Sequence, residues 1–162
     1  MHPITLRQRR RSAFSLIELV VVLVILGVIA AIAIPRMTRG ATNAGGVALK
    51  SSLQTLRGAI ELYRSEHNGL LPTADIGEQL TKFTDANGGN PSDTMNAAMG
   101  IIYGPYLMEL PPLPVGSKKG NRLIETADGA GVGWLYDPTT GVITANTSDT
   151  EVDPDGVKYN TY

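Results

Sequence analysis

Glu18 is the one charged residue in a long apolar stretch, and it is the first candidate for chemistry. Residues 19–34 carry no charged side chain, and extending the stretch back to Phe14 adds only the Glu18 carboxylate. An ionised side chain at the centre of a membrane helix costs about 2.5–3.5 kcal/mol on insertion scales, so it is by default a functional hypothesis. The alternative is a side chain that reaches the headgroup level from near the helix start. The functional hypothesis requires a cationic partner for Glu18.

A second candidate set lies near the C-terminus. It consists of Asp149, Glu151, Asp153 and Asp155. From Glu151 to Asp155 every second residue is acidic and Gly156 follows, which matches relative positions one, three, five and six of an EF-hand loop. Position twelve is Tyr162, so the bidentate carboxylate is missing. The remaining oxygen ligands still suit calcium. The alternative is a solvated, disordered acidic terminus.

Other residue types that support catalysis or metal binding are scarce. The chain has no cysteine, which excludes disulfides and thiolate metal sites. His2 lies in the basic start of the chain and His67 beside Asn68-Gly69, and neither has an evident acid, base or metal partner in the sequence. No phosphate-binding loop is recognisable. We therefore expect no enzymatic activity and no required cofactor, with calcium as the one candidate ligand.

The overall charge balance hides a division of the chain. Residues 1–13 contain four of the 14 Lys and Arg side chains and none of the 15 Asp and Glu side chains, so the net charge changes from −1 to −5 without them. This mildly acidic remainder lacks the clustered basic face that phosphate binding needs, and we expect no nucleic-acid partner. The length of 162 residues suits one modest folded domain besides the N-terminal segment.

The apolar stretch that holds Glu18 has the length of a membrane-spanning helix. Its 21 residues, 14–34, would extend roughly 30 Å at about 1.5 Å per residue. Four arginines precede it within residues 7–11, so the positive-inside rule places residues 1–13 in the cytoplasm and the rest across the membrane. An ordinary signal peptide is the alternative, because Ala31-Ile32-Ala33 is a small-x-small triplet.

The sequence Ala13-Phe14-Ser15-Leu16-Ile17-Glu18, between a basic leader and the apolar stretch, resembles the processing site of type IV pilins and of the pseudopilins of type II secretion. Gly27 and Pro35 stand where that family has a helix-loosening glycine and a helix-kinking proline. The resemblance implies that a prepilin peptidase cuts between Ala13 and Phe14 and methylates the new amine of Phe14. The family usually has glycine before the cut, so we expect slower cleavage after Ala13.

Cleavage would supply the cationic partner that Glu18 lacks. An amine on Phe14 about 4 Å from the carboxylate gains roughly 4 kcal/mol at an effective dielectric constant of about 20, before desolvation is counted. In a filament of staggered helices, the carboxylate of an incoming subunit can meet the amine of a docked one. Apolar packing would then give adhesion, and the charge pair would give alignment.

The rest of the chain predicts an α+β, pilin-like fold. Apolar residues recur at helical spacing from 49 to 63, which predicts that the N-terminal helix continues to about Glu66. The members of this stripe are Leu49, Leu53, Leu56, Ile60 and Tyr63. Asn68-Gly69 would end the helix. Gly45-Gly46 predicts a place where it can stretch or bend.

After this helix we expect a loop-rich region followed by a small antiparallel sheet of about three strands. Short helices are predicted near 76–83 and 94–103. Strands are predicted at 122–126, 132–136 and 142–145, with a hairpin loop at 137–141. Trp134 and Tyr136 alternate to one face, and Trp134 is the expected core residue. The sheet would pack on the exposed half of the long helix.

Two further features narrow the resemblance. Residues 60–73 (IELYRSEHNGLLPT), followed by GPYL and a proline-rich turn, resemble the major pseudopilins of type II secretion. The lack of cysteine separates the chain from many adhesive pilins. In the major pseudopilins a calcium ion orders the region near the C-terminus, so the resemblance supports the acidic set as a calcium site.

The expected organisation is a cytoplasmic leader that is removed (1–13), a transmembrane and filament-core helix (14–35), the exposed half of the long helix (36–68), a variable loop region (69–120), and the sheet with the acidic tail (121–162). The resemblance implies a single-pass protein of the bacterial inner membrane with its C-terminal domain in the periplasm. It would polymerise with copies of itself and with minor pseudopilins on an inner-membrane assembly platform, as a pseudopilus that drives protein export. The alternatives are a type IV pilin of a surface fibre, for adhesion, motility or DNA uptake, and a secreted soluble binding domain.

Overall fold

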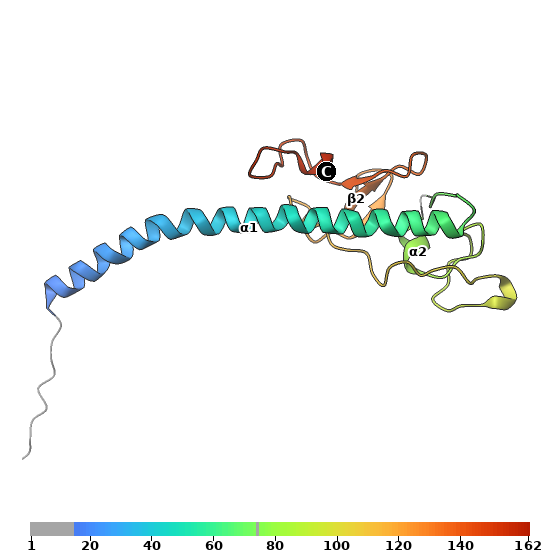
Figure 1. Ribbon diagram of the computed structural model, residues 1–162, viewed down its shortest axis with the longest axis horizontal. Helices are drawn as coiled ribbons and strands as arrows, with labels where there is room; N and C mark the ends of the chain where they lie inside the picture. The colour runs from blue at the N-terminus through green and yellow to red at the C-terminus, as the bar shows by residue number, and fades with distance from the viewer. Residues whose placement is uncertain (1–14, 74) are drawn as a thin grey trace, which may run out of the picture. The chain divides into compact units, whose positions relative to one another are not determined.

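Helix α1 begins at Leu16 and ends at Glu66 in the computed structural model, which describes residues 15–73 and 75–162, without the side chains of 32–43 (Figure 1). The chain divides within this helix into two compact units, residues 1–39 and 40–162. The predicted end of the helix is confirmed. Asn68 has a φ of 55° and Gly69 a φ of 86°, and the Gly69 N–H donates to the Arg64 carbonyl oxygen at 2.8 Å. Residues in this left-handed conformation commonly terminate a helix.

The second unit contains a three-stranded sheet in the order β1–β2–β3. Its strands are β1 (Leu123–Glu125), β2 (Val132–Tyr136) and β3 (Ile143–Ala145). β2 and β3 form the expected antiparallel hairpin. β1 pairs with β2 in parallel, so the sheet is mixed and differs on this point from the predicted antiparallel sheet.

The parallel pairing of β1 with β2 is possible because β1 has only three residues. The chain must then return only about 10 Å before it starts a parallel neighbour. Residues 126–131 span that distance, whereas longer strands need a crossover of about a dozen residues or more. Gly133 lets the neighbouring backbone approach β2, since a Cβ there would lie 2.4 Å from the Asn121 carbonyl oxygen.

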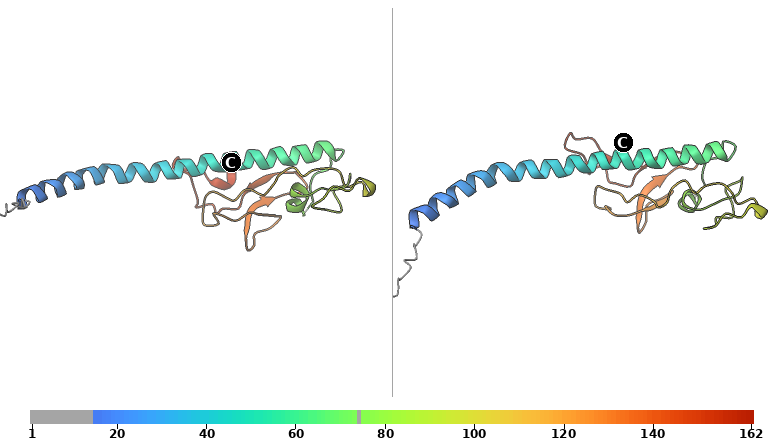
Figure 2. Two further views of the ribbon diagram at one scale, coloured as in Figure 1. Left: turned by 90° about the horizontal axis from the view of Figure 1, so that it is seen from below. Right: turned by 60° about the horizontal axis from the view of Figure 1, so that its bottom comes forward.

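The predicted helical stripe of α1 forms the core with the sheet. Every member is buried, and the stripe forms one cluster with residues of β1, β2 and β3. Trp134 is fully buried, which confirms its predicted core position, and its Nε1–H donates to the Pro111 carbonyl oxygen at 2.9 Å. The Tyr136 hydroxyl donates to the Pro72 carbonyl oxygen at 3.0 Å, and burial raises the pKa of Tyr136 to about 12. The sheet and α2 lie on the same side of α1 in both views of Figure 2.

The predicted short helices exist in reduced form. Helix α2 spans Ile76–Thr81 and ends two residues before the predicted boundary, because Lys82 adopts an extended conformation. A single 3₁₀ turn, η1 (Ala97–Met99), stands where the longer helix 94–103 was predicted. Gly100 ends η1 in the left-handed conformation. A second 3₁₀ turn, η2 (Tyr159–Thr161), follows the sheet.

Candidate functional site

The N-terminal part of α1 presents apolar side chains around its whole circumference. Twelve large aliphatic side chains between Leu16 and Ile29 are 43–81% exposed. Glu18 is the one charged residue among residues 15–31, which we name the apolar helix. A helix that is apolar on all sides is normally buried, and a large exposed apolar patch marks an interaction surface. The apolar helix therefore requires a cover of lipid or of other proteins.

Glu18 closes the first turn of the apolar helix. Its Oε2 accepts a hydrogen bond from the Ser15 N–H at 2.9 Å, and the Leu19 N–H donates to the Ser15 carbonyl oxygen at 3.3 Å. This is one half of a capping box, in which an acid at the third helical position satisfies the N-cap amide. The spacing Ser15-x-x-Glu18 is the sequence signal for this bond, and treating Glu18 only as a charge partner missed it. The carboxylate also lies where the helix dipole favours negative charge.

The other residues predicted for this region are only partly described. Ala13 and Phe14 lie outside the described residues, so the cleavage site, the methylated amine and its pairing with Glu18 stay predictions. A Cβ on Gly27 would meet no neighbouring atom within 4 Å. Helix α1 continues through Pro35, whose side chain is also outside the description. Among the residues that the structure describes, no helix combines the length and the hydropathy of a membrane span.

The predicted calcium ligands lie in the C-terminal segment, which we define as residues 146–162. Asp149 is the first of them. Its Oδ2 lies 2.7 Å from the Lys158 Nζ, and its Oδ1 accepts a hydrogen bond from the Asn160 Nδ2 at 2.8 Å. These bonds, that from Lys158 above all, hold the pKa of Asp149 below its ordinary value. The carboxylate is thus paired with an ammonium of its own chain.

Glu151 connects the C-terminal segment to the loop that precedes β1. Its Oε2 accepts a hydrogen bond from the Ser148 N–H at 2.8 Å, and its Oε1 accepts one from the Ser117 N–H. The two backbone donors lower the pKa of Glu151, that of Ser148 most strongly. Gly116 has a φ of 76°, and a Cβ there would lie 2.9 Å from Glu151 Oε1. The approach of the two loops therefore depends on a glycine at position 116.

Asp153 organises the turn that follows. Its Oδ1 accepts hydrogen bonds from the N–H groups of Asp155 at 2.9 Å and Val157 at 2.8 Å, and its Oδ2 accepts one from the Tyr162 hydroxyl. The bond from Tyr162 contributes most to the lowered pKa of Asp153. Asp155 itself is exposed. Within residues 15–73 and 75–162, no three Asp, Glu, His or Cys side chains are placed to hold a metal ion together. Calcium binding stays a prediction.

A buried histidine joins the end of α1 to the following loop. His67 is fully buried, with Nδ1 2.9 Å from the Tyr63 carbonyl oxygen and Nε2 3.0 Å from Thr84 Oγ1. Its ring stacks on Tyr63 at a centroid distance of 3.8 Å. The Tyr106 hydroxyl beside it donates to Glu66 Oε2 at 2.8 Å, and burial is the main cause of the raised pKa of Tyr106. Sequence reasoning missed this cluster, because no local pattern brings Thr84 to His67.

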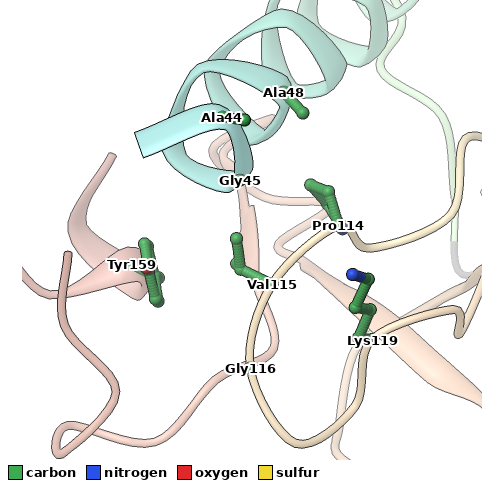
Figure 3. A pocket seen from close by; sticks show the side chains of 8 residues that line it. All are labelled: Ala44, Gly45, Ala48, Pro114, Val115, Gly116, Lys119 and Tyr159. Carbon is green, nitrogen blue, oxygen red and sulfur yellow. The ribbon is translucent and has the colours of Figure 1, made fainter. Parts of the chain in front are cut away.

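A groove with a volume of about 510 Å³ lies between α1 and the loop that precedes β1. Ala44 and Gly45 lie on one side of it, and Val115 and Tyr159 on the other (Figure 3). A Cβ on Gly45 would lie 3.0 Å from Val115 Cγ1, so close packing accounts for glycine at this position, and the bend predicted at Gly45-Gly46 stays a prediction. Lys119 is the one charged residue of the lining. The other lining residues are small, apolar or aromatic.

Comparison with known proteins gives a consistent picture. The prokaryotic N-terminal methylation motif matches residues 8–34. The type II secretion system core protein G of Klebsiella pneumoniae is 32% identical over 109 residues, which are 67% of this chain and 72% of that protein.

Two further relatives carry the same name. The protein of Vibrio cholerae is 27% identical over 113 residues, 68% of this chain and 70% of the relative. That of Pseudomonas aeruginosa is 30% identical over 82 residues, 51% of this chain and 58% of the relative. No solved structure shows a significant match. The motif contains Ala13, Phe14, Glu18 and Gly27, so the resemblance seen in the sequence is confirmed.

Proposed function

The chain belongs to the family of type II secretion system core protein G, and on this basis we propose that it is the major pseudopilin of such a system. It is a structural subunit that polymerises into a periplasmic filament, and the filament drives the export of proteins. The observation that carries this proposal is the apolar helix, with twelve large exposed aliphatic side chains and a single carboxylate. Water is a poor solvent for such a surface. Lipid covers it before assembly, and the apolar helices of neighbouring copies cover it in the filament.

Processing prepares this helix for assembly. The match to the N-terminal methylation motif supports cleavage between Ala13 and Phe14 by a prepilin peptidase and methylation of the Phe14 amine. Residues 1–13 remain in the cytoplasm until then. The subunit waits as a single-pass protein of the inner membrane, with residues 40–162 in the periplasm. The inner-membrane assembly platform then adds it to a polymer of the same chain and of minor pseudopilins.

Glu18 has two functions in this scheme. Its carboxylate caps the apolar helix through the Ser15 N–H. Ser15 follows Phe14 directly in the sequence. The backbone N–H that the carboxylate binds therefore belongs to the residue next to the amine that cleavage creates. In the filament, the same carboxylate pairs with the amine of the adjacent copy and sets the register of two helices that are otherwise uniformly apolar. Gly27 and Pro35 give the helix the flexibility that this packing requires.

The chain acts without catalysis. His67, the buried histidine, is engaged by Tyr63 and Thr84, and the groove of Figure 3 is lined mainly by small and apolar residues. Both observations support a structural subunit rather than an enzyme. The expectation of no nucleic-acid partner belongs to the same proposal.

Processing is tested by the intact mass of the native protein from the membrane fraction. We expect loss of residues 1–13, retention of the apolar helix and one added methyl group. A mature N-terminus after Ala33 would instead identify a released soluble domain. A chain that still begins with Met1 would leave Glu18 without its cationic partner and would contradict the proposal.

The alignment function is tested by two substitutions of Glu18. Glu18→Gln keeps a side-chain acceptor for the Ser15 N–H and removes the charge, whereas Glu18→Ala removes both. We expect both variants to be cleaved and to fold. Both should lower the filament yield by about tenfold or more, because a loss of 1.4 kcal/mol in the free energy of association corresponds to a factor of ten. Glu61→Gln, which neutralises an exposed carboxylate elsewhere on α1, serves as the control and should assemble normally. Normal filaments from Glu18→Gln would show that assembly does not need the charge, and a loss confined to Glu18→Ala would assign the effect to the cap.

A further inference from the structure

The family resemblance implies that a calcium ion holds the C-terminal segment in a fixed conformation. Hydrogen-bond donors of this chain account for that conformation instead. Asp149, Glu151 and Asp153 together have six carboxylate oxygens, and each accepts a hydrogen bond from this chain. The donors are one ammonium, one amide, one hydroxyl and four backbone N–H groups. Calcium needs six to eight oxygens directed at one point. The carboxylates of this segment are instead directed at separate donors.

The separate donors hold different parts of the segment together. The Lys158 ammonium bonds to the Asp149 carboxylate nine residues earlier in the chain. Val152 and Lys158 also form an isolated antiparallel β-bridge. The Tyr159 N–H donates to the Glu151 carbonyl oxygen at 3.1 Å, and the Asp153 N–H donates to the Val157 carbonyl oxygen at 2.8 Å. The segment is therefore a closed loop, and Lys158 provides the positive charge beside its first carboxylate.

The geometry points to a C-terminal segment that is ordered without calcium, in which the Lys158 ammonium and the backbone N–H groups do the work that the resemblance assigns to the metal ion. The residues present do not fit the implied site. The chain thereby departs from the resemblance in this segment, and the inference does not depend on the filament role.

Two buried oxygens belong to residues close to Asp149. Thr147 Oγ1 and Asn160 Oδ1 are buried and have no hydrogen-bond partner in the part of the chain that the structure describes. Both are neutral oxygens of a kind that calcium accepts, but the carboxylate beside them is that of Asp149, whose two oxygens bond to Lys158 Nζ and Asn160 Nδ2. Neutral buried oxygens of this kind are typical partners of an internal water molecule. They do not complete a calcium site with Asp149 alone.

The inference is tested on the full-length protein in detergent micelles, with thermal unfolding followed by the fluorescence of Trp134. The melts are compared in millimolar calcium, in millimolar magnesium and in EDTA. We expect the same Tm in all three. A site that binds calcium with a Kd one hundredth of the added concentration would raise the Tm by roughly 10 °C for a domain of this size.

Two lysine variants distinguish stabilisation by the Lys158 ammonium from stabilisation by a bound calcium ion. Lys158→Met should lower the Tm by about 2 °C, equally in all three solutions, because the exposed ion pair contributes little. Lys119→Met, which removes an exposed lysine of the neighbouring loop, is the matched control and should leave the Tm unchanged. A calcium-specific rise in the Tm of the unmodified chain, lost in Asp153→Asn or Asp155→Asn, would overturn the inference. A Tm of Lys158→Met equal to that of Lys119→Met would remove Lys158 from it.

Discussion

Replacing Gly133 with alanine tests the contact that makes the mixed sheet possible. A Cβ at this position would lie 2.4 Å from the Asn121 carbonyl oxygen and 2.8 Å from its carbonyl carbon, whereas ordinary contacts begin at 3.4 Å. The backbone must therefore move by about 1 Å. The Asn121 carbonyl oxygen already accepts the Leu113 N–H at 2.8 Å, and the Gly133 carbonyl oxygen accepts the Asn146 N–H at 2.9 Å. Movement of either backbone segment weakens one of these bonds.

The size of the effect follows from these contacts. Forcing a methyl group into a packed core costs about 1–3 kcal/mol, and the upper value applies here because the obstacle is backbone and cannot rotate away. About 3 kcal/mol lowers the Tm by about 12 °C for a domain of this size. Trp134, the only tryptophan, is fully buried beside the substitution and reports unfolding by fluorescence. The thermal melt of Gly133→Ala should therefore shift far below that of the unmodified chain.

Gly129→Ala is the matched control, because it adds the same methyl group to the connection between β1 and β2. A Cβ at Gly129 would lie 3.5 Å from Val132 Cγ2, an ordinary contact. We expect this variant to melt with the unmodified chain. If Gly133→Ala melted within about 2 °C of Gly129→Ala, the backbone of Asn121 would not lie over Gly133 and the explanation of the parallel pairing would be wrong.

Two further predictions concern the polar contacts of the second unit. Thr84→Val should lower the free energy of unfolding by about 1–3 kcal/mol, because it leaves Nε2 of the buried His67 without its partner. Thr84→Ser keeps the hydroxyl and should cost less in the same denaturant titration; a loss in Thr84→Val no larger than that in Thr84→Ser would contradict the role of the hydroxyl. The lowered pKa of Glu151 predicts stability that is present above its unfolded pKa of about 4.5 and lost as the pH falls through the folded pKa. The difference in Tm between the unmodified chain and Glu151→Gln should therefore shrink in acid, and a difference that stays constant would contradict the assigned hydrogen bonds.

The local patterns of the sequence were sufficient to predict much of the fold. The apolar stripe from Leu49 to Tyr63 correctly predicted the buried face of α1, because helical spacing alone decides which side chains share a face. The turn residues between β2 and β3 correctly predicted the hairpin, and Asn68-Gly69 correctly predicted the end of α1. Each of these features is set by residues close together in the chain.

Features that depend on distant residues were not predictable in this way. The partner of His67 is Thr84, and the backbone over Gly133 belongs to Asn121. Neither pair leaves a local signature. The direction of β1 depends on its length of three residues, and strand ends are the least reliable part of a pattern. The acidic set near the C-terminus has the spacing of a calcium loop, but spacing does not say where each carboxylate points.

In the proposed function, Glu18 satisfies a local and an assembly requirement together. The capping bond from Ser15 is available in every single copy, because it uses only the residue's own helix. A carboxylate that serves only as a cap is replaceable by glutamine, since the bond needs an acceptor and not a charge. A carboxylate that also aligns two copies is not replaceable, because the amine of the neighbour needs the charge. The comparison of Glu18→Gln with Glu18→Ala therefore separates the folding of the helix from its assembly. Under this proposal the exposed apolar side chains around Glu18 are the reason that alignment requires a charge, since apolar side chains pack equally well in many registers.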